Sequence, residues 1–123
     1  MKKQQLQATF EGGEVRVSLF LYIDEHVHVC YSPELDLFGY GNTEDEALRS
    51  FGVVLTDYLT YGVTNHTLVD DLTQLGWTVD VSRQLFTAPA LHELLIRNTD
   101  FSQTLQNRSF RKLDRFVDFA AAA

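Results

Sequence analysis

Hydrophobic and polar residues alternate with a period of two along residues 14–23 and 26–31, which is the spacing of β-strands. Shorter segments at 6–10 and 37–41 have strand-like composition, and polar turns are expected at 11–14 and 24–25. The side chains predicted to face the core are Val15, Val17, Leu19, Leu21, Ile23, Val27, Val29 and Tyr31. The pattern predicts a meander of three antiparallel strands (6–10, 14–23 and 26–31) with 37–41 as a short edge segment.

The pattern then changes to the spacing of helices. Thr43 and Glu46 form a capping box, in which the hydroxyl accepts from the amide of Glu46 and the carboxylate reaches back. The stripe that follows is Ala47, Phe51, Leu55, Tyr58 and Leu59, and Gly62 is the expected C-cap. A second helix is predicted from Thr67 to Gly76, with Leu68, Leu72 and Leu75 as its stripe. Residues 77–81 alternate again and are predicted as a fourth strand.

Residues 1–82 are therefore predicted to form an α+β domain of order βββα(α)β, with one sheet and helices on one face. Residues 83–123 are predicted to be a C-terminal extension of short helices. Its apolar positions are Leu91, Leu94, Leu95, Phe101 and Leu105, followed by an extended stretch with Phe116, Val117 and Phe119. The extension is expected to act as a lid, a dimer arm or a partner contact.

Charge separates the same two parts of the chain. Residues 1–82 carry 13 acidic and 4 basic residues, whereas residues 83–123 carry 4 acidic and 6 basic ones, within a total net charge of −7. An acidic body repels nucleic-acid phosphates and attracts a basic partner. The single cysteine, Cys30, and the polar start of the chain favour a cytoplasmic protein, and no stretch is apolar enough to span a membrane.

Two candidate ligand sites, a phosphate-binding loop and a zinc site, are suggested by short stretches of the chain. Gly39 and Gly41 do not fit a phosphate-binding loop, because the motif lacks its lysine and three acids follow at once. His26, His28 and Cys30 are spaced so that one strand face would present them together, as zinc ligands do. The competing interpretation is a polar, half-exposed strand face. No residue is predicted to be catalytic, and no cofactor is expected.

Four aromatic residues, Phe20, Tyr22, Phe38 and Tyr40, do not fall on the predicted core face. Aromatic residues gathered on a surface are typical of protein interfaces, but the C-terminal extension would equally well cover them as a second core layer. Together with Glu34 and Asp36, they form the predicted partner-binding surface.

The segment Pro33-Glu34-Leu35, then Gly41-Asn42-Thr43 and Glu46-Ala47, and later Leu75-Gly76-Trp77, resembles the HicB-like antitoxin family. Asn42 stands where that family usually has an acid. The resemblance covers residues 14–81 and implies a partial ribonuclease-H-like fold without the catalytic acids of true nucleases. It also implies an antitoxin that binds a small basic RNA-cleaving toxin of the HicA type, encoded nearby. Many family members also carry a C-terminal DNA-binding element, which they use for autorepression as a dimer or higher oligomer.

Residues 83–123 show neither a helix-turn-helix nor a ribbon-helix-helix pattern. The leading expectation is thus a non-catalytic antitoxin that sequesters its toxin by protein–protein contact. The alternative is a nucleic-acid-binding transcriptional regulator that acts through Arg108, Arg111, Lys112 and Arg115, and the third is a small metalloenzyme. Whether the chain is a homodimer or a higher oligomer stays open.

Overall fold

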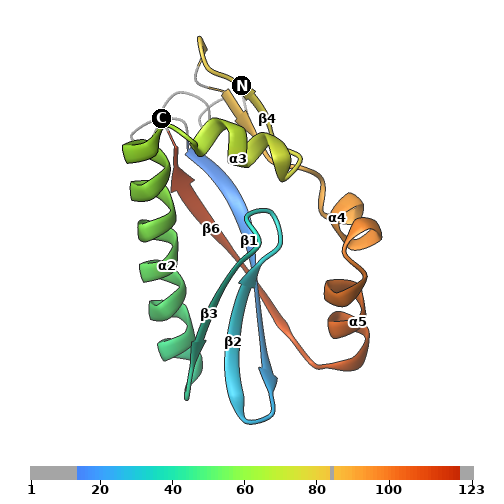
Figure 1. Cartoon of the computed structure of the whole chain (residues 1–123). Coiled ribbons are helices and arrows are strands. Elements are labelled where there is room, and N and C mark those ends of the chain that lie inside the picture. The colour runs from blue at the N-terminus through green and yellow to red at the C-terminus, as the bar shows by residue number, and fades with distance from the viewer. Residues whose placement is uncertain (1–13, 84, 120–123) are drawn as a thin grey trace, which may run out of the picture.

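The computed structural model describes residues 14–83 and 85–119, which form a mixed α+β fold (Figure 1). The predicted strand at 6–10, and the turn leading from it, lie outside these residues. The elements are β1 (Glu14–Asp24), β2 (Val27–Ser32), β3 (Leu37–Gly41), α2 (Glu44–Asn65), α3 (Leu68–Gln74), β4 (Thr78–Asp80), β5 (Leu85–Thr87), α4 (Leu91–Arg97), α5 (Thr99–Asn107) and β6 (Arg111–Asp118).

The main sheet has four antiparallel strands in the order β3-β2-β1-β6. The predicted meander is confirmed for residues 14–41, and the segment at 37–41 is a full strand at one edge. The opposite edge is β6, which pairs with β1 from Glu14↔Asp118 to Leu21↔Arg111. The predicted helical extension therefore also supplies a strand to the main sheet, and most of the basic segment 108–115 is part of it.

The predicted fourth strand lies elsewhere. β4 pairs with β5 in a separate two-stranded sheet, with Val79 opposite Phe86. The prediction that residues 77–81 would join the single sheet was wrong, because β6 occupies the place beside β1. The predicted boundary after residue 82 falls between the two strands of this hairpin.

Helices cover both faces of the main sheet, not one face as predicted (Figure 1). Val17, Leu19 and Leu21 of β1 pack against Phe51 of α2 in the main core. On the other face, Phe20 of β1 packs beside Phe101 of α5 in a second, smaller core. The hydrophobic residues at both odd and even positions of β1 reflect this double coverage.

The face of β2 is the reverse of the one predicted. Cys30 lies opposite Leu21 and faces the main core, whereas Tyr31 lies opposite Phe20 and faces the second core. The register with β1 decides this, because paired residues share a face. Val27, which was predicted to be in the core, is 39% exposed.

Helix α2 begins as predicted and ends later. The amide of Glu46 donates to Thr43 Oγ1 (3.1 Å), and Glu46 Oε1 accepts from the amide of Asn42 (2.8 Å). Gly62 is buried inside the helix, where a Cβ would lie 2.9 Å from Leu68 Cβ, and the left-handed C-cap is His66. The predicted C-cap role of Gly62 was wrong, because α3 packs against that point.

Candidate interaction surface

Two rows of side chains cross the sheet on the face opposite α2. Each row takes one residue from β1, one from β2 and one from β3, because paired residues of antiparallel strands share a face. The rows are Phe20–Tyr31–Phe38 and Tyr22–Val29–Tyr40. Five of these six side chains are aromatic, and they include all four aromatics that the sequence left off the core face.

The aromatic side chains become more exposed from β1 toward β3. Phe101 of α5 covers the first row, with its ring centroid 5.1 Å from Phe20 and 5.3 Å from Tyr31 in edge-to-face geometry. Phe38 stacks on Tyr31 at 4.2 Å and on Tyr40 at 5.9 Å. The exposed fraction rises from 2% at Phe20 to 37% at Phe38 and 55% at Tyr40. Helix α5 therefore closes one end of this aromatic face and leaves the end at β3 open.

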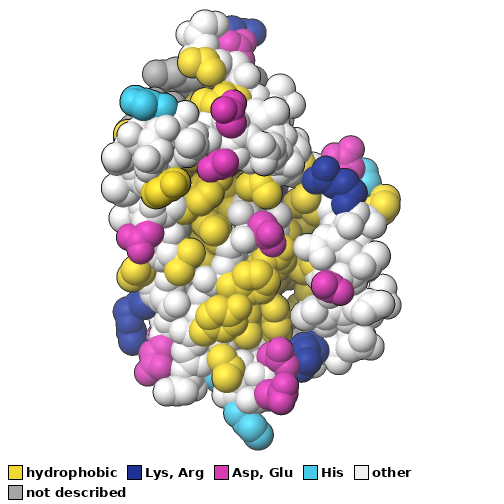
Figure 2. Space-filling view, viewed as in Figure 1, with side chains coloured by type: hydrophobic (Ala, Val, Ile, Leu, Met, Phe, Trp, Pro, Cys, Tyr) yellow, Lys and Arg dark blue, Asp and Glu magenta, His cyan; other side chains and the backbone are white. Residues whose placement is uncertain are grey.

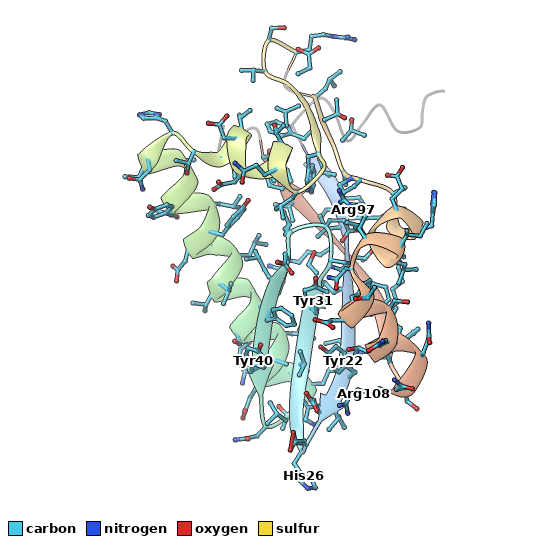
Figure 3. All side chains as sticks on the ribbon, turned by 45° about the vertical axis from the view of Figure 1, so that its right-hand side comes forward. Tyr22, His26, Tyr31, Tyr40, Arg97 and Arg108 are labelled. Carbon is cyan, nitrogen blue, oxygen red and sulfur yellow. The ribbon has the colours of Figure 1, made fainter. Side chains whose placement is uncertain are left out.

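The second-core interpretation of the four aromatics is confirmed for Phe20, and the interface interpretation stays a prediction for the exposed Phe38 and Tyr40. Figure 3 shows Tyr22, Tyr31 and Tyr40 on three neighbouring strands. In Figure 2 hydrophobic side chains gather over the front of the sheet, with acidic side chains around them. The extension buries Phe20, while Phe38 and Tyr40 remain at the surface.

A groove of about 370 Å³ lies between this face and the α4–α5 segment. It is lined by Tyr22, Tyr31, Asp36, Phe38, Asn98, Asp100, Phe101 and Thr104, and we call it the aromatic groove. At its floor, the Tyr31 hydroxyl donates to Asp36 Oδ1 (2.8 Å) and accepts from Asn98 Nδ2 (3.1 Å). Burial, and then the hydrogen bond to Asp36, raise the pKa of Tyr31, so the hydroxyl stays protonated. This hydroxyl joins the β2–β3 turn to the helices.

Asn98 has two roles where α4 meets α5. It ends α4, and its Oδ1 accepts from the amide of Phe101 as the N-cap of α5 (3.0 Å). Its side-chain amide is thereby aimed at Tyr31. The sequence did not point to Asn98, Asp100 or Thr104 as site residues. The sequence feature that could have indicated this wall of the aromatic groove is the apolar stripe of residues 83–123, because such a stripe is normally buried against another part of the chain.

The predicted acidic pair Glu34 and Asp36 is divided between interior and surface. Glu34 is 5% exposed, and its Oε1 accepts from the backbone amide of Ser18 (3.0 Å), where β2 no longer pairs with β1. Its carbonyl oxygen accepts from Trp77 Nε1 (2.8 Å). Asp36 is exposed, in the left-handed backbone region with φ of 54°. Glu34 thus fixes the turn, and Asp36 is the residue of the pair that faces outward.

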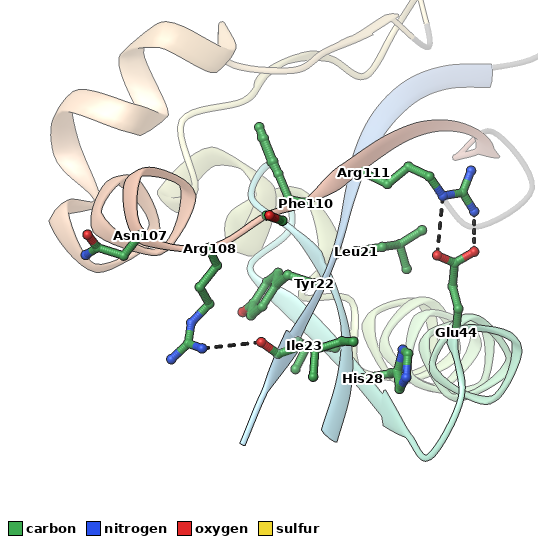
Figure 4. Close-up of a pocket in the computed structure, with 11 residues that line it drawn as sticks. Leu21, Tyr22, Ile23, His28, Glu44, Asn107, Arg108, Phe110 and Arg111 are labelled. Atoms are coloured by element: carbon green, nitrogen blue, oxygen red, sulfur yellow. Dashed lines mark hydrogen bonds and ion pairs between the residues drawn. The ribbon is translucent and has the colours of Figure 1, made fainter. Parts of the chain in front are cut away.

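The basic residues of the nucleic-acid alternative are largely engaged within the chain, as Figure 4 shows for Arg108 and Arg111. Arg108 Nη2 lies 2.8 Å from Asp24 Oδ1, and Lys112 Nζ lies 2.9 Å from Asp114 Oδ1. Arg111 makes two hydrogen bonds to Glu44, which lower the pKa of that carboxyl.

A cavity of about 470 Å³ separates Arg108 and Arg111, and the fourth basic residue, Arg115, lies beside Gly52 of α2. A phosphate would have to compete with carboxylates for Arg108, Arg111 and Lys112.

The three candidate zinc ligands do not form a common site. Cys30 is fully buried in the main core, and burial raises the pKa of its thiol to about 12, which disfavours the thiolate a metal needs. His26 lies in the β1–β2 turn with φ of 73°, and His28 is partly buried on β2. Within residues 14–83 and 85–119, no three His, Cys, Asp or Glu side chains are placed to hold a metal ion. The geometry of the described chain gives the metalloenzyme alternative no support.

No helix in the described part of the chain has the length and apolar character needed to cross a membrane. Comparison of the chain with protein-family models, with curated proteins and with solved structures finds no match. The HicB-like resemblance therefore stays a prediction, and any function has to be argued from the chemistry of the surface.

Proposed function

We propose that this protein is a non-catalytic, antitoxin-like binding protein that sequesters a small basic mRNA-cleaving toxin of the HicA type by protein–protein contact. The observation that carries the proposal is the open end of the aromatic face, where Phe38 and Tyr40 stack in parallel at the edge strand of an acidic body. Exposed aromatic residues anchor many protein interfaces, because they bury a large area with few rotatable bonds.

Charge favours a basic partner. The body, residues 1–82, carries all of the excess acid, and around the hydrophobic surface over β2 and β3 acidic side chains outnumber basic ones (Figure 2). Opposite charges on two proteins raise their rate of association and disfavour wrong partners. A basic toxin meets this requirement, whereas a nucleic acid does not.

The candidate reactive groups also favour a binding role over a catalytic one, because they are buried within the fold. The Cys30 thiol is buried and remains protonated, and the Glu34 carboxylate accepts from the backbone of β1. Both groups stabilise the fold.

The test is co-expression of this chain with the protein encoded in the adjacent reading frame. We expect the two to co-purify, and we expect this chain to relieve growth arrest caused by that protein. Tyr40→Ser should weaken the complex, and Tyr61→Ser is the matched control, because Tyr61 is 64% exposed on α2. No complex and no rescue would overturn the proposal. Recovery of a DNA duplex instead, with affinity falling steeply as salt rises, would favour the regulator alternative.

A further inference from the structure

We propose that the aromatic groove receives an arginine side chain of the basic partner. This inference rests on the proposed function and specifies the chemistry by which the groove would recognise its partner. The groove is small enough for one long side chain, at the lower end of the range for ligand pockets.

The first argument is the charge of the lining. Asp36 of the β2–β3 turn and Asp100 of α5 approach the groove from its two walls, and both are exposed. The groove contains no basic side chain among its described lining residues, and neither aspartate forms an ion pair within the described chain. The two aspartates of the groove differ in this respect from the acids near segment 108–112, which already pair with arginine and lysine side chains. The groove is therefore a place where a cation from outside has carboxylates to pair with.

The second argument is the aromatic wall. Tyr22 and Phe38 line the groove beside the carboxylates, and Tyr31 forms its floor. A planar guanidinium stacks on aromatic rings while it donates hydrogen bonds to carboxylates, and an ammonium group does so less well. An apolar side chain would desolvate the two aspartates without supplying a cation to pair with them. Arginine is the side chain that matches both parts of the lining.

The third argument is that the groove is formed before a partner binds. The hydrogen bonds of the Tyr31 hydroxyl to Asp36 and Asn98 hold the two walls at a fixed separation. Asp36 sits at a left-handed backbone position, which restricts where its carboxylate can point. Groups that are already in place lose less conformational entropy on binding.

The experiment uses the full chain and two fluorescent peptides of glycine and serine, one with three arginines and one with neutral citrulline at the same positions. Affinity is measured by fluorescence anisotropy at a fixed, moderate salt concentration. We expect the arginine peptide to bind and the citrulline peptide to bind at least about tenfold more weakly, since charge-assisted hydrogen bonds are lost.

The decisive variant is Asp36→Asn with Asp100→Asn. Asparagine tolerates the left-handed backbone and still accepts from Tyr31, so the fold is preserved. The matched control is Asp45→Asn with Asp57→Asn, which removes the same charge from exposed sites on α2, the helix on the other face. We expect about a tenfold loss of arginine-peptide affinity for the first pair and less than about twofold for the second. Equal losses would mean diffuse attraction to an acidic protein, and would overturn the proposal.

A second variant tests the aromatic wall without changing charge. Phe38→Leu is expected to lower the affinity for the arginine peptide by about two- to fivefold, because a cation–π contact is lost while an apolar side chain remains. Unchanged affinity would contradict the stacking part of the proposal.

Failure here is distinguishable from failure of the proposed function. If the Asp36→Asn and Asp100→Asn variant still captures the adjacent-frame protein as well as the natural chain does, the groove proposal fails and the antitoxin proposal stands. If the natural chain captures nothing, but the arginine peptide binds with the expected selectivity, the groove proposal stands without the antitoxin.

Discussion

The two faces of the main sheet are built from the same strands but are closed to different degrees. On the α2 face, helices and the β4–β5 hairpin enclose a core that includes the fully buried Phe51, Phe86 and Phe119. On the opposite face, the buried cluster of the described residues is Phe20, Tyr31 and Phe101, and the aromatic rows continue past it to the surface. The first face mainly holds the fold together, and the second leaves aromatic side chains exposed at the surface.

The largest expected difference is between two phenylalanines. Phe51→Ala on the closed face should lower the free energy of unfolding by about 3–5 kcal/mol, because a fully buried ring is replaced by a cavity. Phe38→Ala on the open face should cost about 1 kcal/mol, since its ring is partly hydrated already. Urea denaturation followed by circular dichroism measures both. Similar losses would mean that the open face is as much a core as the closed one.

The closed face should also respond to alkaline pH. Burial raises the pKa of the Cys30 thiol from an ordinary value of 9.0 to about 12, so the folded chain keeps a proton that the unfolded chain releases. The unfolding free energy should therefore be unaffected by this group below about pH 9. It should then fall by up to about 1.4 kcal/mol per pH unit as pH rises toward 12.

Tyr58, with its pKa raised to about 12 by burial, adds a similar loss above about pH 10. Denaturation midpoints between pH 8 and 11 measure this profile. Cys30→Ala should remove the part that begins near pH 9, and an unchanged profile in that variant would contradict the assignment.

Two glycines test how closely α2 lies on the sheet. A Cβ at Gly39 would lie 2.4 Å from Phe51 N and 2.5 Å from Ala47 O, which are backbone atoms that cannot turn aside. Gly39→Ala should therefore destabilise the fold by about 1–3 kcal/mol or more, measured by thermal unfolding. Gly52→Ala is the control within α2, where a Cβ would meet nothing closer than an Arg115 nitrogen at 3.8 Å. It should stabilise by up to about 1 kcal/mol, because alanine favours the helix.

The smallest difference between paired variants is expected at the boundary between the covered and exposed parts of the second face. Tyr31→Phe removes the hydroxyl that joins Asp36 to Asn98, and should cost about 1–2 kcal/mol. Tyr58→Phe is the matched change, since the buried Tyr58 hydroxyl has no hydrogen-bond partner among the described residues, and it should be neutral or slightly stabilising. Chemical denaturation of both variants makes the comparison. An equal loss of stability in the two variants would mean that the Tyr31 hydroxyl does not stabilise the contact between the β2–β3 turn and the helices.

Much of the fold could be predicted because its signals are local. The alternation within 14–23 and within 26–31, the capping box at Thr43 and the stripe through Phe51 each lie within one element, and the structure confirms these two strands and the helix. The predicted core face of the second strand was wrong, because the register with β1 and not the local pattern sets it. The left-handed cap at His66 was missed, because the position of α3 and not the local sequence sets the end of α2.

Long-range pairing was the part that local patterns did not reveal. Leu113 and Val117 of β6, and Phe119 directly after it, face the main core, although the same part of the chain is marked by its basic residues. For the site, the four aromatics were identified, but the wall formed by Asn98 and Asp100 was not. That wall depends on how α5 packs across the sheet, and no spacing within the chain encodes such a contact.

The pairing of β1 with β6 has a consequence for biosynthesis. β1 is made well before β6, so this neighbour leaves the ribosome on the order of 10 s after β1 at ordinary rates of translation. During that interval the nascent chain carries an open strand edge with hydrophobic residues on both faces, which is the type of surface that self-associates or recruits chaperones. Slowing translation between β1 and β6 would lengthen this vulnerable period and should lower the yield of soluble protein.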